Sequence, residues 1–225
     1  MKRAPLPDDR GHLTTELRNA ASDALDTLSI EDAVALVQRE DATIHAALAV
    51  ARPAIVTALT LIVERLARGG RLIYVGAGTS GRLAVLDATE CPPTFQTPPE
   101  MVQAVIAGGV KALTGAVEGA EDDAQAARVE LEARMLSKDD IVFGIAAGGT
   151  TPFVHGALAF ARERGAASVF LACVPFEQAP DRADVSIRVV TGAEVLTGST
   201  RLKAGTATKL VLNTVTTLAM ARLGK

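Results

Sequence analysis

Five short runs of β-branched or apolar residues constrain the fold of this chain more than any other feature. The runs are RLIYV (71–75), MVQAVIA (101–107), DIVFGIA (140–146), ASVFLACV (167–174) and VSIRVV (185–190). They lack a clean alternation of apolar and polar residues, which is typical of strands buried on both faces of a sheet. Helical patterns separate them, and this order predicts an α/β fold with a doubly wound parallel sheet.

The helical patterns divide the chain into an arm and a domain. Between the strands they cover about 80–88, 111–117, 124–135 and 152–164, and a last one spans about 205–223. Ahead of the first strand, Ser29 begins a helix in a capping pattern. A second helical region, about 42–68, is expected to bend or restart near Pro53. We therefore predict an N-terminal arm of residues 1–28 and a domain of residues 29–225 that includes the N-terminal helices.

Composition disfavours several classes of protein. Aromatic residues make up 3% of the chain, tryptophan is absent and the net charge is −3. A nucleic-acid partner is therefore not expected. The most apolar stretch, residues 46–63, carries Arg52 and Pro53 in its middle, so we expect a buried helix and no membrane span.

The cysteines and the N-terminus indicate a compartment. Cys91 and Cys173 have neither metal-ligand nor redox spacing, and no cluster of histidines, cysteines and carboxylates has metal-ligand spacing. We expect no metal and a reducing, cytoplasmic setting. The sequence MKRAPLPDDRGHL lacks the apolar core of a signal peptide.

The segment GAGTSG (76–81) follows the first predicted strand and begins a helix. Free N–H groups and the helix dipole make such a turn receptive to an anion. The segment satisfies G-x-G-x-x-G, but a dinucleotide site also needs an acidic residue at the end of the second strand. That strand ends in Gly108-Gly109. We therefore favour a phosphate monoester over NAD, with a glycine turn that holds no ligand as the other alternative.

A second loop repeats this plan after the third strand, with Pro152 near the start of the next helix. Carboxyl ends of parallel strands meet at one edge of a sheet, so both loops can face one crevice. The crevice would suit a small phosphorylated ligand. The predicted binding residues are Gly78, Thr79, Ser80, Gly148, Gly149, Thr150 and Thr151.

Two acidic residues lie near this crevice in sequence. Glu90 follows a helix that we expect to end before Pro92, so its carboxylate is either exposed or folded back to the crevice. Glu121 belongs to an acidic cluster, and such clusters commonly complement the dipole of the following helix. Cys91 lacks a base in the sequence, so we interpret it as a structural thiol and not as a nucleophile.

Several longer segments resemble one known family, the N-acetylmuramic acid 6-phosphate etherases, which contain a sugar isomerase (SIS) domain. The resemblance covers roughly residues 11–225. Its specific blocks are ECPPTF, EGAED and LTGSTRLKAGTA. The segments are TTELRN (14–19), GRLIYVGAGTSGRLAVLDATECPPTF (70–95), AGGVKALTGAVEGAEDD (107–123), DDIVFGIAAGG (139–149) and AEVLTGSTRLKAGTATKLVLN (193–213).

The resemblance implies a homodimeric, cofactor-free lyase of peptidoglycan recycling. Such an enzyme cleaves the ether between C3 of a phosphorylated amino sugar and D-lactate. By the same resemblance Glu121 takes the C2 proton, Glu90 protonates the departing oxygen, and water adds at C3. The two carboxyl groups should then have pKa values that their environments push apart. Lys203 and Glu194 match the late motif and could line the site, although a salt bridge at a helix start is an equal alternative.

This chain also departs from the family's pattern. The family's second loop usually reads A-S-G-R-T-P, and here residues 147–152 read A-G-G-T-T-P. The family also continues for a further helical segment, which we expect to be absent because the chain stops at Lys225. Two other functions therefore remain open: a non-catalytic SIS-family regulator that binds sugar phosphates, and an aldose–ketose phosphate isomerase.

Overall fold

A computed structural model describes residues 10–225, so part of the predicted arm and part of the segment used to exclude a signal peptide lie outside the described residues. Five parallel strands form one sheet in the order β2-β1-β3-β4-β5. The α/β fold and the parallel sheet are confirmed. The strands are β1 (Leu72–Gly76), β2 (Val102–Ile106), β3 (Ile141–Ile145), β4 (Ala167–Ala172) and β5 (Val185–Arg188).

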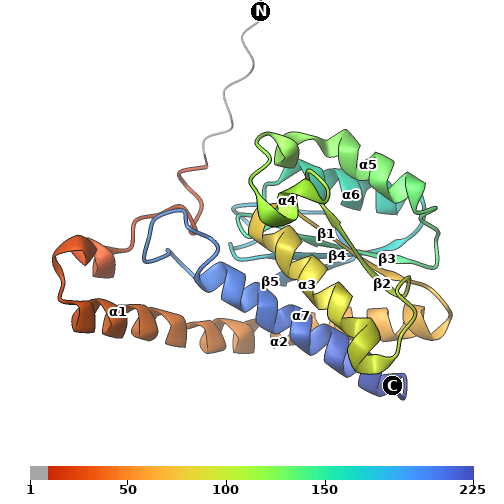
Figure 1. Cartoon of the computed structure of the whole chain (residues 1–225), viewed down its shortest axis with the longest axis horizontal. Coiled ribbons are helices and arrows are strands. Elements are labelled where there is room, and N and C mark those ends of the chain that lie inside the picture. The colour runs from red at the N-terminus through yellow and green to blue at the C-terminus, as the bar shows by residue number, and fades with distance from the viewer. Residues whose placement is uncertain (1–9) are drawn as a thin grey trace, which may run out of the picture.

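Helices cover both faces of the sheet (Figure 1). One face packs against α2 (Ile44–Ala67), α3 (Gly78–Phe95) and α7 (Lys203–Arg222), and the other against α5 (Ala124–Ala133) and α6 (Pro152–Glu163). Successive side chains of β1 point to opposite faces of the sheet. Leu72 and Tyr74 pack in the hydrophobic cluster under α2, α3 and α7, and Ile73 and Val75 pack in the cluster under α5 and α6. Because both faces are covered, every residue of β1, β3 and β4 is buried, as the apolar runs predicted.

The helix α1 (Ile30–Ala42) extends beyond the edge of the sheet (Figure 1). Its start is confirmed, because the Ser29 hydroxyl accepts a hydrogen bond from Asp32 N at 3.1 Å. The helix stops at Thr43, and α2 then runs from Ile44 through Pro53 to Ala67.

The expectation that residues 46–63 form a buried helix is correct for one face only. Ala58 and Ile62 are fully buried, whereas Val50 is 80% exposed. Among the described residues the run Ile30–Ala67 is long and apolar enough to cross a membrane by length and composition alone, a test that packing helices also pass. The Arg52 and Pro53 in its middle favour packing.

The helix α3 is longer than predicted. We expected an end before Pro92, but the helix continues through both prolines to Phe95, and Gln96 ends it with a φ of 54°. Each proline removes one N–H donor from the helix, but the last turn still closes, because Gln96 N donates to Pro92 O at 2.9 Å. As a result Glu90 lies on a helix and not on a loop that could fold back.

A buried carboxylate fixes α3 against its neighbours. Asp87 accepts hydrogen bonds from the Tyr74 hydroxyl at 3.0 Å and from Thr216 Oγ1 at 3.2 Å. Burial raises the pKa of Asp87 despite these two donors. The contact joins α3 to β1 and α7, so it holds in place the helix whose first turn carries the glycine loop.

The short helix α4 (Lys111–Thr114) and three 3₁₀ turns complete the described residues. The turns are η1 (Ala20–Ser22), η2 (Leu25–Thr27) and η3 (Ala120–Asp122). The turn η3 carries Glu121, and Asp123 then caps α5 by accepting hydrogen bonds from Gln125 N and Ala126 N, both at 3.0 Å. Asp123 is therefore the member of the acidic cluster that caps α5, and the Glu121 side chain takes no part in this cap.

Candidate active site

A pocket of about 170 Å³ opens at the carboxyl edge of the sheet, between β1 and β3. Both predicted loops line it. β1 and β3 pair in register up to Gly76 and Ile145, which brings the loops that follow them side by side. The loop residues in its wall are Gly78, Thr79, Ser80, Gly148, Thr150 and Thr151.

Each loop leads into the first turn of a long helix. Gly78 begins α3 with a φ of 51°, a left-handed conformation that favours glycine. Thr151 precedes α6, and Pro152 occupies its first turn as predicted. Two helix N-termini and several hydroxyl groups therefore border one small cavity, which is a favourable environment for an anion.

Gly149 was predicted to bind the ligand, but it does not line the pocket. Its φ is 78°, and a Cβ there would lie 2.5 Å from Ala179 Cβ. Its N–H donates to Ala146 O at 2.9 Å, and its carbonyl oxygen lies 2.7 Å from His155 Nε2. Gly149 therefore fixes the conformation of the second loop without lining the pocket.

Two carboxylates and one guanidinium join the loops in the pocket wall. Glu121 lines the pocket, and Glu16 and Arg10 lie there too. Arg10 Nη1 lies 3.6 Å from Glu121 Oε1. Thr200 also lines this pocket. Arg10, Glu16 and Thr200 were not predicted as site residues, although Glu16 and Thr200 belong to the TTELRN and LTGST segments that resemble the etherases.

The N-terminal arm reaches the pocket by packing against its own chain. Thr14 donates to Gln178 Oε1 from its backbone N–H at 2.9 Å and from its hydroxyl at 2.6 Å. Leu13 is 1% exposed and packs close to Gly148 in the second loop. These contacts hold Arg10 and Glu16 against the pocket of the same chain.

A second cavity of about 370 Å³ adjoins the first and shares Ala77, Gly78 and Glu121 with it. Arg82 lines this second cavity, and its guanidinium donates to Leu113 O at 3.2 Å and to Gly115 O at 2.8 Å. Glu121 therefore stands where the two cavities meet. The small cavity can hold an anionic group, and the larger one has room for the body of a sugar.

Glu90 does not share this pocket within one chain. It is exposed on α3, twelve residues beyond Gly78. At 1.5 Å per residue, this separation is about 18 Å along the helix. The structure therefore brings Glu121 to the loops and leaves Glu90 on another part of the surface.

Lys203 also lies outside the pocket. Its ammonium is 2.6 Å from Glu40 Oε2, and its side chain is 4% exposed. Glu194 instead caps α7, accepting hydrogen bonds from the N–H groups of Lys203 and Ala204, both at 2.9 Å. Burial raises the pKa of Glu194, which these two donors partly offset. Glu194 therefore acts at the start of α7 and does not line the pocket.

The cysteines are buried thiols. Burial raises the pKa of Cys91 to about 12 and that of Cys173 to about 12. A thiol with such a pKa is a poor nucleophile at neutral pH, in agreement with a structural role for Cys91. Among the described residues, no group of three or more histidines, cysteines and carboxylates could hold a metal ion.

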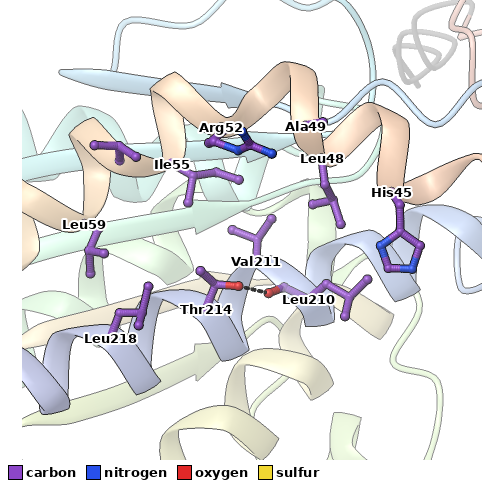
Figure 2. A pocket seen from close by; sticks show the side chains of 11 residues that line it. His45, Leu48, Ala49, Arg52, Ile55, Leu59, Leu210, Val211, Thr214 and Leu218 are labelled. Carbon is purple, nitrogen blue, oxygen red and sulfur yellow. Dashed lines mark hydrogen bonds between the residues drawn. The ribbon is translucent and has the colours of Figure 1, made fainter.

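An apolar groove of about 470 Å³ lies elsewhere, between α2 and α7. Figure 2 shows aliphatic side chains from the two helices facing each other across it, with His45 at one end. It shares no residue with the two cavities at the loops. The groove is lined by His45, Leu48, Ala49, Arg52, Ile55, Val56, Leu59, Leu210, Val211, Thr214 and Leu218.

The part of the chain that carries both loops matches a SIS-type domain. The sequence model of the glucokinase regulatory protein N-terminal SIS domain matches residues 54–162. The fold is similar to phosphoheptose isomerases from Neisseria gonorrhoeae (TM-score 0.63, 18% identity, covering 86% of this chain and 100% of that one) and Francisella tularensis (0.62, 17%, 85% and 98%). At such identities these structures establish the fold alone.

Sequence relatives define the family within this class. N-acetylmuramic acid 6-phosphate etherases from Gloeobacter violaceus and Prochlorococcus marinus are 59% and 55% identical to the chain. These alignments cover 98% and 97% of the chain, and 72% and 69% of the relatives. A third, from Synechocystis, is 53% identical over 97% of the chain and 72% of its own length. The chain belongs to the N-acetylmuramic acid 6-phosphate etherase family.

Proposed function

We propose that this chain is a carbon–oxygen lyase that cleaves the D-lactyl ether of N-acetylmuramic acid 6-phosphate. The products are N-acetylglucosamine 6-phosphate and D-lactate. Identities of 53–59% to etherases carry the proposal, and a pocket that joins two anion-receptive loops to a carboxylate supports it. The expectation of no cofactor stays part of the proposal.

The two loops would hold the phosphate and orient the sugar. Hydroxyl groups of Thr79, Ser80 and Thr151 line the small cavity beside the N-termini of α3 and α6. Remote binding of this kind fixes the reacting carbons and lowers the entropic part of the barrier. The sugar would then extend past Glu121 into the larger cavity.

Glu121 is proposed as the base that removes the C2 proton. That proton becomes acidic when C1 is an open-chain aldehyde, because the electron pair left on C2 delocalises into the carbonyl group. The pair then forms the C2–C3 double bond as the C3–O bond breaks, and the lactate oxygen takes a proton from an acid. Water adds at C3 and returns a proton to C2. Each proton transfer contributes roughly 10²–10⁴-fold.

Glu90 is proposed as the acid, acting in the pocket of a second copy of the chain. The separation of about 18 Å along α3 excludes its own pocket, and an exposed position on α3 leaves its carboxylate accessible to a partner. The chain is accordingly proposed to be a homodimer whose two sites are each built from both subunits.

Exposed apolar side chains support a second copy as the partner. Val50 is 80% exposed and Val56 is 55% exposed on α2, and Val34 on α1 is 51% exposed. Exposed apolar side chains are often found at protein interfaces. Two unpaired, buried cysteines agree with the proposed cytoplasmic setting in the recycling of cell-wall amino sugars.

The test is release of D-lactate from N-acetylmuramic acid 6-phosphate by the purified chain. We expect release by the wild type and its loss in Glu121→Gln and in Glu90→Gln. Glu100→Gln, an exposed carboxylate outside both cavities, is the control. Binding of hexose phosphates without lactate release would favour the regulator. Conversion of an aldose phosphate to a ketose phosphate would favour the isomerase.

A further inference from the structure

The guanidinium of Arg10 stands in the pocket wall beside Glu121. Arg10 Nη1 is 3.6 Å from Glu121 Oε1, and Arg10 Nη2 is 3.9 Å from Asp122 Oδ1. Among the described residues that line this pocket, Arg10 carries the single positive charge. A cation at this position is suited to an anionic group that lies next to the proposed base.

The chain holds Arg10 in place through the residues that follow it. Its carbonyl oxygen accepts a hydrogen bond from Leu13 N at 3.0 Å, which closes a turn. Leu13 is buried in the core cluster beneath the second loop, and Thr14 is bound to Gln178. The position of Arg10 is therefore set by tertiary contacts and not by its ion pairs alone.

The guanidinium of Arg10 can still accept a ligand. Its two ion-pair distances exceed the 2.7–2.9 Å or so of a charge-assisted hydrogen bond, and its side chain is 38% exposed. Arg82, the arginine of the adjoining cavity, is different, because its Nε and Nη2 already donate to Leu113 O and Gly115 O. Of the two arginines, Arg10 therefore has more donors available for a ligand carboxylate.

The chemistry of the substrate identifies the ligand group, on the basis of the proposed function. N-acetylmuramic acid 6-phosphate carries two anions, the phosphate on C6 and the carboxylate of the lactyl group on C3. The hydroxyl groups and helix N-termini of the two loops suit the phosphate. Because C3 is bonded to C2, the lactyl group must lie close to the base that takes the C2 proton, and Arg10 is the cation beside Glu121.

We infer that Arg10 binds the carboxylate of the D-lactyl group and selects the ether over sugars that lack it. A guanidinium matches a carboxylate through two parallel N–H···O bonds, so one residue both recognises and orients the leaving group. Binding this carboxylate also offsets its repulsion from Glu121.

The experiment compares two ligands that differ in the lactyl group. For wild type, Arg10→Ala and Arg10→Lys, kcat/KM is measured for N-acetylmuramic acid 6-phosphate, and the inhibition constant is measured for N-acetylglucosamine 6-phosphate. Arg18→Ala is the matched control, since Arg18 is 81% exposed on the same arm and lies outside the pocket. Circular dichroism melting curves check that each variant folds.

We expect Arg10→Ala to lower kcat/KM about 10- to 100-fold and Arg10→Lys to lower it less, because a lysine keeps the charge but not the paired donors. The inhibition constant should change less than about twofold. The substrate with its lactyl carboxylate converted to a carboxamide should be equally poor for wild type and Arg10→Ala. Equal weakening of both ligands would assign Arg10 to the phosphate and overturn the inference, as would an unchanged kcat/KM. Absence of lactate release by wild type would instead overturn the proposed function, and the inference with it.

Discussion

Lys203 Nζ lies 2.6 Å from Glu40 Oε2, and this ion pair joins the first turn of α7 to the last turn of α1. Asn19 Nδ2 donates to the same carboxylate oxygen at 2.8 Å, so the arm is tied to both helices. The hydrogen bond from Lys203, opposed in part by burial, lowers the pKa of Glu40. The pair thus stabilises the segment before α7, in which Thr200 contributes to the pocket.

Glu40→Gln is therefore expected to destabilise the fold. The change removes the ion-pair partner of the buried Lys203 ammonium, which costs on the order of 3 kcal/mol in the free energy of unfolding. Urea denaturation measures this, with Glu64→Gln on an exposed part of α2 as the control. The double change Glu40→Gln/Lys203→Met should be more stable than Glu40→Gln alone. A double variant that is less stable would argue against an uncompensated charge as the cause.

Asp140 predicts part of the dependence of stability on pH. Burial raises its pKa, but hydrogen bonds from Arg71 and Ser137 outweigh burial and leave the pKa below the usual 3.8. A depressed pKa contributes stability above the unfolded value, and this contribution is lost as the pH falls through the folded value. In Asp140→Asn, the decline in stability below about pH 5 should be shallower than in wild type. Urea midpoints from pH 7 to pH 3 measure the slope, and parallel curves would exclude Asp140 as a source of the decline.

Glycine can be required in the loops for two reasons, a left-handed backbone or a lack of space for a Cβ, and substitutions at Gly78 and Gly149 distinguish them. Both have positive φ, but only at Gly149 would a Cβ meet a neighbour, Ala179. Gly78→Ala should cost about 1–2 kcal/mol for the left-handed backbone. Gly149→Ala should cost about 1–3 kcal/mol more through overpacking, and displacement of the second loop should raise KM. Equal stability of the two variants in urea would mean that the Ala179 contact relaxes freely.

The sheet and the loops were predictable because their signals are local. Runs such as 71–75 and 140–146 are apolar throughout, and parallel strands bring the loops after them to one edge whatever the details of packing. Leu13 shows what could not be predicted. One buried leucine in an irregular arm carries Arg10 and Glu16 to the pocket, and no periodic pattern identifies such a contact.

Glu90 and Lys203 show a second limit. The motif around Glu90 was assigned a role by resemblance, but its position depended on whether Pro92 ends the helix, and the structure continues the helix to Phe95. Lys203 was assigned to the ligand in the same way, and its partner is Glu40, 163 residues away in the sequence. Resemblance identified these two residues, whereas their surroundings depend on contacts between distant segments.

Two exposed valines on α2 provide a test of the proposed oligomeric state. Val50→Asp with Val56→Asp should convert the proposed homodimer to a monomer, because each change introduces a charge into apolar surface that a second copy would cover. Light scattering after size exclusion measures the mass. Thr57→Asp, an exposed polar position on the same helix, is the control. A wild type that is monomeric at all concentrations would contradict the homodimer.

Mixing two inactive variants tests whether Glu90 and Glu121 meet across subunits. If each site takes Glu121 from one chain and Glu90 from the other, a mixed dimer of Glu90→Gln and Glu121→Gln chains contains one intact site and one doubly altered site. Half of randomly assembled dimers are mixed, so the pooled sample should recover about a quarter of wild-type lactate release. Refolding equal amounts of the two variants together, and each alone, provides the measurement.

Glu16 supplies the control for this mixing experiment, because it lines the same pocket as Glu121 within one chain. Should Glu16→Gln prove inactive, mixing it with Glu121→Gln restores no intact site. Both residues line the pocket of their own chain, so each pocket of a mixed dimer carries one altered residue and stays inactive unless the arm crosses to its partner. Recovery with Glu90→Gln but not with Glu16→Gln would therefore support a site completed by a second copy through α3. An active Glu90→Gln together with an inactive Glu16→Gln would transfer the role of acid to Glu16, whose carboxylate needs no partner subunit to reach the pocket.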